Sequence, residues 1–278
     1  MANIFNRVWV LEGPNRTRLV EWRLTGLSAL ENPVFYIEVA YGGGEFLRLN
    51  PTTPVTNVCY YELDVTLGSG TRPPDWYRVV MVDGLTTYTS QPAQVGTGIP
   101  RQRWIQIKEI MRLEYVRMRV GPGIPGYLLI RKEQGTKCTE CLDDDTGGVI
   151  DSNCEACRGT GIIGGYYAPY YPYYISVDKP IAKEKTVMEP FATVDPKTLT
   201  VRCLAYPTVE PDSIWVDGYT GRRWIFQQLQ VAADMLGVPL IYSAALNCIP
   251  ATWAENTIPV SEIVNTENWR TQGAGITG

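Results

Sequence analysis

Four cysteines have a spacing that is typical of a metal site. The run from 138 to 157 follows the pattern C-x2-C-x12-C-x2-C, formed by Cys138, Cys141, Cys154 and Cys157. Each Cys-x-x-Cys pair can direct two thiolates to one side, and two pairs complete a tetrahedral set of four sulfurs. Glycines in GTKC and CRGTG let the backbone turn sharply around such a site. The spacing therefore predicts structural zinc, with a redox-active or disulfide-bonded arrangement as the alternative.

The chain contains no histidine. This excludes Ser-His-Asp and Cys-His catalysis as well as histidine-bearing zinc hydrolase sites. Four protein ligands would also leave a metal ion no open position for water or substrate. We therefore expect a metal that stabilises the fold and a protein that is not an enzyme. In an oxidising medium the same thiols could instead form disulfides.

A tyrosine-rich tract, GGYYAPYYPYY (164–174), follows the cysteines. Tyrosine offers a large, rigid contact area with a polar tip, and proline limits regular structure. Such a tract either packs as a strap across its own chain or forms a subunit contact. Its candidate contact residues are Tyr166, Tyr167, Tyr170, Tyr171, Tyr173 and Tyr174.

The strongest helix signal lies at 101–120, RQRWIQIKEIMRLEYVRMRV. One apolar face recurs at spacings of three or four residues. It is formed by Trp104, Ile107, Met111, Tyr115 and Met118. Pro100 suits the first turn and GPGIPG (121–126) ends the helix. Residues 101–133 carry eight basic and three acidic side chains within a chain of net charge −4. Arg112, Arg117 and Arg119 are candidate contacts to an acidic partner or to DNA phosphates, with a solvated surface as the alternative.

The rest of the chain is predicted to be mainly β. Short β-branched and aromatic runs separated by turn clusters recur through residues 1–97, which favours a β-sandwich. Similar runs return at 187–250 and predict a small sheet or barrel. The polar segment 251–278 is expected to form an extended arm over another surface. The segment 98–121 holds the amphipathic helix, and 122–186 holds the metal segment and the tyrosine strap. Cys59, Cys203 and Cys248 lie in β-rich or apolar runs and are expected in the core.

The N-terminal third resembles a fibronectin type III domain, an immunoglobulin-like sandwich. The resemblance rests on Trp22 in VEWRL and Tyr77 in YRVVMVDG. The whole chain resembles neck-region virion proteins of tailed bacteriophages. That resemblance is carried by the fibronectin-like start, the helix at 101–119, the cysteine run KCTECLDDDTGGVIDSNCEACRGTGIIGGYY and the C-terminal IWVDGYTGRRWIF.

The resemblance implies a structural collar, connector or adaptor subunit. Such a subunit forms a homo-oligomeric ring at the head–tail junction and contacts portal-side and tail-side proteins. We expect assembly in the host cytoplasm, since no secretory signal or membrane-spanning run is visible. Two other hypotheses are kept. One is a recognition or tail and baseplate module that uses the fibronectin-like domain, and the other is a zinc-binding or redox protein.

Overall fold

The chain is mainly β with one α-helix among the residues that the structure describes. The computed structural model describes residues 4–12, 17–25, 33–41, 44–50, 53–64, 76–95, 101–132, 135–143, 148–178 and 198–260. Two compact units are present. The first comprises Met1–Leu113 and Lys132–Ala168, and the second comprises Glu114–Arg131 and Pro169–Gly278. Each unit is described by itself below.

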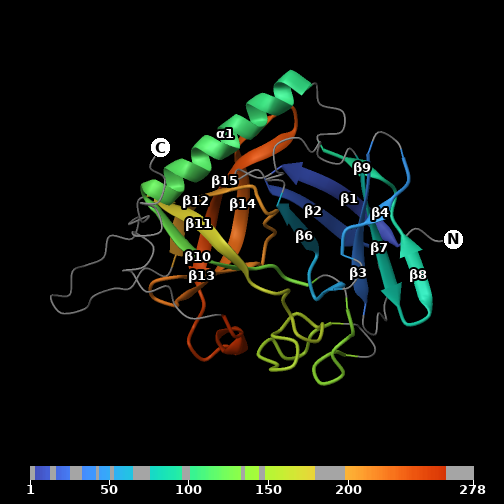
Figure 1. Cartoon of the computed structure of the whole chain (residues 1–278). Coiled ribbons are helices and arrows are strands. Elements are labelled where there is room, and N and C mark those ends of the chain that lie inside the picture. Colours follow the sequence, from blue (N-terminus) through green and yellow to red (C-terminus); the bar gives the residue numbers. More distant parts are fainter. Residues whose placement is uncertain are drawn as a thin grey trace. The chain divides into compact units, whose positions relative to one another are not determined.

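The first unit contains a β-sandwich (Figure 1). Its strands are β1 (Phe5–Glu12), β2 (Thr17–Leu24), β3 (Val34–Ala40), β4 (Leu47–Arg48), β5 (Val55–Thr56), β6 (Tyr60–Asp64), β7 (Trp76–Asp83), β8 (Thr86–Thr89) and β9 (Ala93–Gln94). One sheet has the order β1-β2-β6. The other has the order β4-β3-β7-β8, with β5 also on β3 and β9 also on β7. All of these strand pairs are antiparallel.

The sandwich core comes from alternate residues of both sheets. Trp22 on β2 packs against Phe35 on β3, with ring centroids 4.9 Å apart. Tyr77 on β7 is fully buried in the same cluster, and its hydroxyl accepts a hydrogen bond from the buried Arg18. Because side chains of a strand alternate between faces, residues two apart line this core. The predicted sandwich and both of its predicted core aromatics are confirmed.

The α-helix α1 runs from Arg101 to Val120, which are the predicted bounds. Ile107, Met111 and Met118 of the predicted apolar face are buried. After the helix, the N–H of Gly121 donates to the Arg117 carbonyl at 2.9 Å. A Cβ at Gly123 would lie 2.3 Å from the Met118 carbonyl oxygen, so only glycine fits this turn.

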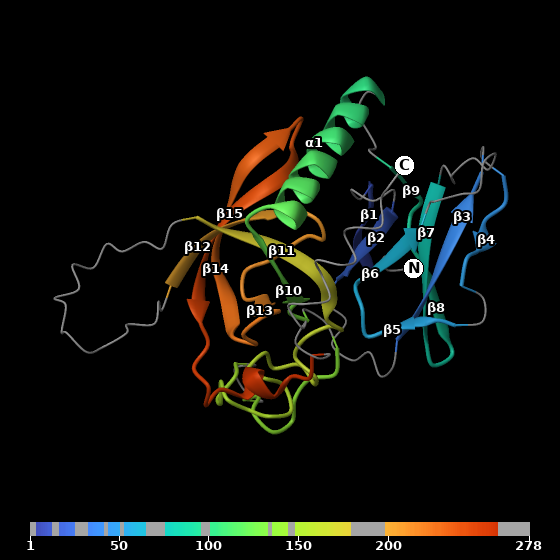
Figure 2. The ribbon, with the colours of Figure 1, turned by 60° about the vertical axis from the view of Figure 1, so that its left-hand side comes forward.

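The second unit contains a closed barrel of six strands (Figure 2). The strands are β10 (Gly123–Leu129), β11 (Tyr170–Asp178), β12 (Thr198–Leu204), β13 (Ile214–Asp217), β14 (Arg223–Met235) and β15 (Val238–Cys248), and their order is β10-β11-β12-β15-β14-β13. The core includes Trp215, Phe226 and Leu246. The prediction left a sheet and a barrel open, and the structure shows the barrel.

The compact units differ from the five segments expected from the sequence. The predicted segment 122–186 contains β10 and β11, but both strands belong to the barrel and not to the metal segment. β10 pairs with both β11 and β13, so the barrel closes through strands that the 187–250 segment does not contain. The cysteine segment is grouped with the sandwich in the first unit.

The start of the predicted C-terminal arm is packed on the barrel. A 3-10 helix, η1 (Ala254–Thr257), lies within it, and both Ala254 and Glu255 are buried. The buried Arg223 guanidinium donates to the carbonyls of Glu255 and Ile258, each at 2.6 Å. These bonds hold the backbone of the predicted extended arm against the barrel of its own chain as far as Ile258. Residues 261–278 lie outside the described residues.

Within the described part of the chain, no helix combines the length and apolar character that crossing a membrane requires.

Candidate metal centre

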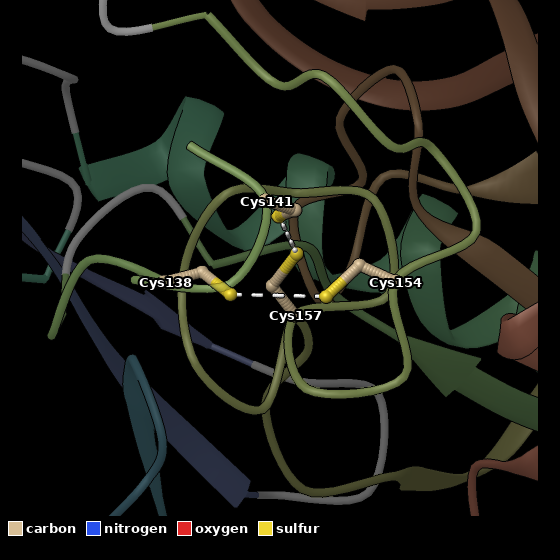
Figure 3. Close-up of side chains that lie close together, drawn as sticks. All are labelled: Cys138, Cys141, Cys154 and Cys157. Atoms are coloured by element: carbon tan, nitrogen blue, oxygen red, sulfur yellow. Dashed lines mark hydrogen bonds between the residues drawn. The ribbon is translucent and has the colours of Figure 1, made fainter. Parts of the chain in front are cut away.

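The four predicted cysteines come together in one cluster. They lie on the connection between β10 and β11, in a stretch of turns with two isolated β-bridges, Lys137–Ile162 and Leu142–Val149. Figure 3 shows the four side chains pointing toward a common centre. Each is at most 6% exposed.

The four sulfur atoms are close enough to share one ion. All of them lie within 4.8 Å of one another. The Sγ atoms of Cys138 and Cys154 are 3.8 Å apart, and those of Cys141 and Cys157 are 3.1 Å apart. A tetrahedral ion with metal–sulfur bonds of about 2.3 Å separates its sulfurs by about 3.8 Å. The cluster therefore has the size of a four-thiolate site and could bind a metal ion.

Backbone hydrogen bonds hold the two Cys-x-x-Cys pairs in place. The Cys138 N–H donates to the Gly161 carbonyl at 2.9 Å, which ties the first pair to the end of the second. The Ile150 N–H donates to the Cys141 carbonyl at 2.8 Å. The hydroxyl of Thr160 donates to the Cys157 carbonyl at 2.7 Å. These bonds orient the thiols without help from a helix or strand.

Glycine is required at one tight point of the segment. Gly159 has φ +71°, and a Cβ there would lie 2.3 Å from the Ser152 carbonyl oxygen. Residues with a Cβ rarely adopt this backbone conformation, and moving the Ser152 backbone to make room would cost free energy. The glycine after Cys157 therefore lets the chain return past Ser152, as its place in CRGTG suggested.

The surroundings of the thiols separate their acidities. Backbone N–H groups, first that of Cys157, lower the pKa of the Cys154 thiol. The hydrogen bond with Cys157 raises the pKa of the Cys141 thiol, and burial raises the pKa of Cys157 itself. The Cys154 thiol therefore loses its proton more readily than the thiols of Cys141 and Cys157. A cation in the cluster would favour the thiolate of each.

The cluster is suited to holding an ion and poorly suited to turnover. Four thiolates fill a tetrahedral shell, so no position remains for water or a substrate. Leu142 and Ala156 pack against the sulfurs and shield them. The segment has little other apolar core, so an ion would supply much of its stability.

The predicted tyrosine contacts divide between the two units. Tyr166 is buried in the first unit, and Tyr167 is partly buried there. Tyr170, Tyr171, Tyr173 and Tyr174 belong to β11 of the barrel. The part of the tract from Tyr170 onward is therefore a strand where regular structure was not expected, even though Pro172 lies within it.

Tyr173 was a candidate contact residue, but it is buried in the core of the barrel. Its hydroxyl donates to the Leu204 carbonyl at 2.7 Å, and its carbonyl accepts from the Trp215 indole at 3.3 Å. Tyr166 is corrected for the same reason, since both side chains are buried in their own unit. Tyr171 is exposed and Tyr174 partly exposed. These two also have ring partners in the second unit, Tyr127 and Tyr115 respectively.

The three predicted arginines lie along α1. Arg112 pairs with Glu109 at 2.6 Å, and Arg117 pairs with Glu114 at 2.8 Å. Arg119 is partly exposed. Exposed pairs of this kind contribute little to stability. Since the helix carries six basic and only two acidic residues, its positive charge is only partly compensated.

Sequence reasoning missed two structural features near these residues. Thr160 supports the second cysteine pair through its hydroxyl, and the signal for it was a threonine between two glycines that favours a local side-chain turn. The exposed aliphatic side chains of α1 were also not expected, because a helix that covers a core normally has polar residues on its other face.

No protein-family profile, curated protein or solved structure significantly matches this chain.

Proposed function

We propose that this protein is a non-catalytic structural subunit of a tailed-bacteriophage virion, that it forms a homo-oligomeric ring at the head–tail junction, and that its four cysteines hold structural zinc. The observation that carries the structural role is the buried cluster of four sulfurs within 4.8 Å. Zinc is the metal that suits a closed set of four thiolates in a tetrahedral arrangement.

The place in the virion rests on the resemblance of the sequence to neck-region proteins. The order of sandwich, helix, cysteine segment and C-terminal β unit fits that proposal. Neighbouring subunits of the same chain, portal-side proteins and tail-side proteins are the proposed partners. Assembly would take place in the host cytoplasm, where reduced thiols can bind zinc.

Zinc would act here as a structural cross-link between the two Cys-x-x-Cys pairs. Cys138, Cys141, Cys154 and Cys157 are its proposed ligands. Closing the two pairs around one ion fixes the connection between β10 and β11, which otherwise depends on backbone hydrogen bonds and two isolated bridges. Metal binding of this kind is coupled to folding, so the free energy of binding stabilises the segment.

The test combines metal content with particle shape. Protein purified under reducing conditions should contain one zinc ion per chain and should show rings by negative-stain electron microscopy. Cys141→Ser should lose the zinc and reduce assembly. Cys248→Ser is the matched control, because Cys248 is partly buried and lies outside the cluster. Protein without zinc, together with normal assembly of Cys141→Ser, would refute the structural role of zinc. A protein that is monomeric under all conditions would refute the ring.

A further inference from the structure

A second apolar stripe runs along the exposed side of α1. Its members are Ile105, Leu113, Val116 and Val120, which are between 42% and 78% exposed. At 3.6 residues per turn, these four positions fall within about 80° of the helix circumference. The buried residues Ile107, Met111 and Met118 lie on the opposite side. We call the exposed set the outer stripe.

The outer stripe is unusual for a helix face in contact with water. A helix that covers a core normally has polar residues on its other face. Single exposed aliphatics are ordinary, but Leu113, Val116 and Val120 are spaced three and four residues apart and so lie side by side on the helix, with Ile105 two turns earlier on the same face. Neighbouring exposed apolar side chains of this kind are typical of an interaction site.

The charges around the outer stripe define what could cover it. Glu109 lies within the stripe and is paired with Arg112. On the helical wheel, Arg112 and Arg119 flank one side of the stripe and Arg117 flanks the other. The helix carries six basic and two acidic residues, whereas the chain as a whole has net charge −4. The remainder of the chain therefore has 19 basic and 27 acidic residues and a net charge of −8.

We propose that the outer stripe is a docking site for a second copy of this chain, which contacts it through an acidic, partly apolar region other than its own α1. This inference rests on the proposed ring. Pairing of two α1 helices would bring like charges together, which is unfavourable, while the basic helix and the acidic remainder are complementary. A contact between two different surfaces is also the kind that closes into rings.

The experiment removes apolar character from the stripe without changing its charge. The double variant Val116→Gln and Val120→Gln keeps good helix formers on the surface. The control variant Leu85→Gln and Val231→Gln changes two exposed aliphatics elsewhere. Self-association is measured by sedimentation velocity, with zinc content and circular dichroism as checks of folding. If the double variant is unfolded, Ile105→Gln replaces it.

We expect the stripe variant to weaken self-association at least tenfold and the control variant to leave it unchanged. We also expect sodium chloride to weaken self-association of the wild type, because salt screens attraction between a basic and an acidic surface. Equal self-association of wild type and stripe variant would overturn the inference and leave the ring intact. A monomeric wild type would instead remove the ring itself.

Two further outcomes would assign the stripe to another occupant. Self-association that tightens with salt would indicate pairing of two α1 helices, because screening relieves repulsion, and would overturn the acidic partner. Flotation of the wild type, but not of the stripe variant, with phosphatidylserine vesicles in the absence of self-association would assign the stripe to a lipid surface and would also overturn the inference.

Discussion

Cys141 and Cys157 belong to different Cys-x-x-Cys pairs, yet their Sγ atoms are only 3.1 Å apart. The remaining two cysteines, Cys138 and Cys154, are likewise matched across the pairs at 3.8 Å. The two halves of the motif are therefore interleaved, and each thiol has its partner in the other half.

This pairing predicts which disulfides form when metal is removed. Mild oxidation with diamide should give Cys141–Cys157 and Cys138–Cys154, each bond forming as two thiols lose two electrons and two protons to the oxidant. Cleavage after Glu140 and Glu155 and at Asp151 separates the four cysteines, so mass spectrometry of unreduced peptides identifies the links. Dominant Cys138–Cys141 and Cys154–Cys157 links would contradict the observed arrangement.

Gly159→Ala should destabilise the metal segment. The new Cβ meets the Ser152 carbonyl oxygen at 2.3 Å, and φ is +71°. We expect the free energy of unfolding to fall by about 2 kcal/mol or more, since backbone strain and a steric clash add. Gly84→Ala is the control, because φ there is +57° but no atom lies within 4 Å. It should cost only about 1 kcal/mol. Zinc titration and chemical denaturation measure both, and equal losses would show that the Ser152 contact is unimportant.

Arg223→Lys should loosen the backbone around η1. The guanidinium serves two carbonyls, those of Glu255 and Ile258, whereas an ammonium cannot reproduce this forked geometry. We expect a loss of about 1–3 kcal/mol, the typical worth of a hydrogen bond from a charged group. The Ile258 amide should exchange faster with deuterium in this variant. Arg222→Lys changes the adjacent exposed residue and should leave the exchange unchanged. Unaltered exchange of the Ile258 amide in Arg223→Lys would show that the two Arg223 hydrogen bonds do not hold this backbone.

The barrel should lose stability in alkaline solution. Burial raises the pKa of the Cys203 thiol to about 12 and raises the pKa of Tyr173. Both groups stay neutral in the folded barrel while the unfolded chain releases their protons near pH 8.5 and 10, so the folded state binds more protons at high pH. The stabilising contribution is complete below about pH 8.5 and then falls by about 1.4 kcal/mol per pH unit for each group that titrates. Denaturation between pH 8 and pH 11 tests this. Cys203→Ala should flatten the decline, and an unchanged slope would contradict the assignment.

The amino-acid sequence predicted the elements that depend on local pattern. The bounds of α1 follow from an apolar period near 3.6 and from the glycines after it. The sandwich strands follow from alternation between turn clusters, and Trp22 and Tyr77 lie in the core as expected. The cysteine set follows from spacing, because short loops bring nearby thiols together whatever the rest of the fold does.

Several features could not be read from the same patterns. The strand β11 was not predicted, because a tyrosine-rich run that contains Pro172 does not have a typical strand pattern. Its position is decided by pairing with β10 and β12. Burial of Tyr173 and exposure of Tyr171 depend on which face of that strand meets the barrel core. No sequence pattern predicts the two hydrogen bonds of Arg223, because the carbonyls that accept them lie more than thirty residues away.

The sequence by itself determined which residues can be metal ligands, where the helix begins and ends, and that the chain is mainly β, since these depend on neighbours a few positions apart. Only the tertiary structure decided that the thiols pair across the motif, that β10 and β11 close the barrel, and that the outer stripe of α1 stays exposed. Those outcomes depend on contacts between distant segments, whose free energies no local pattern contains.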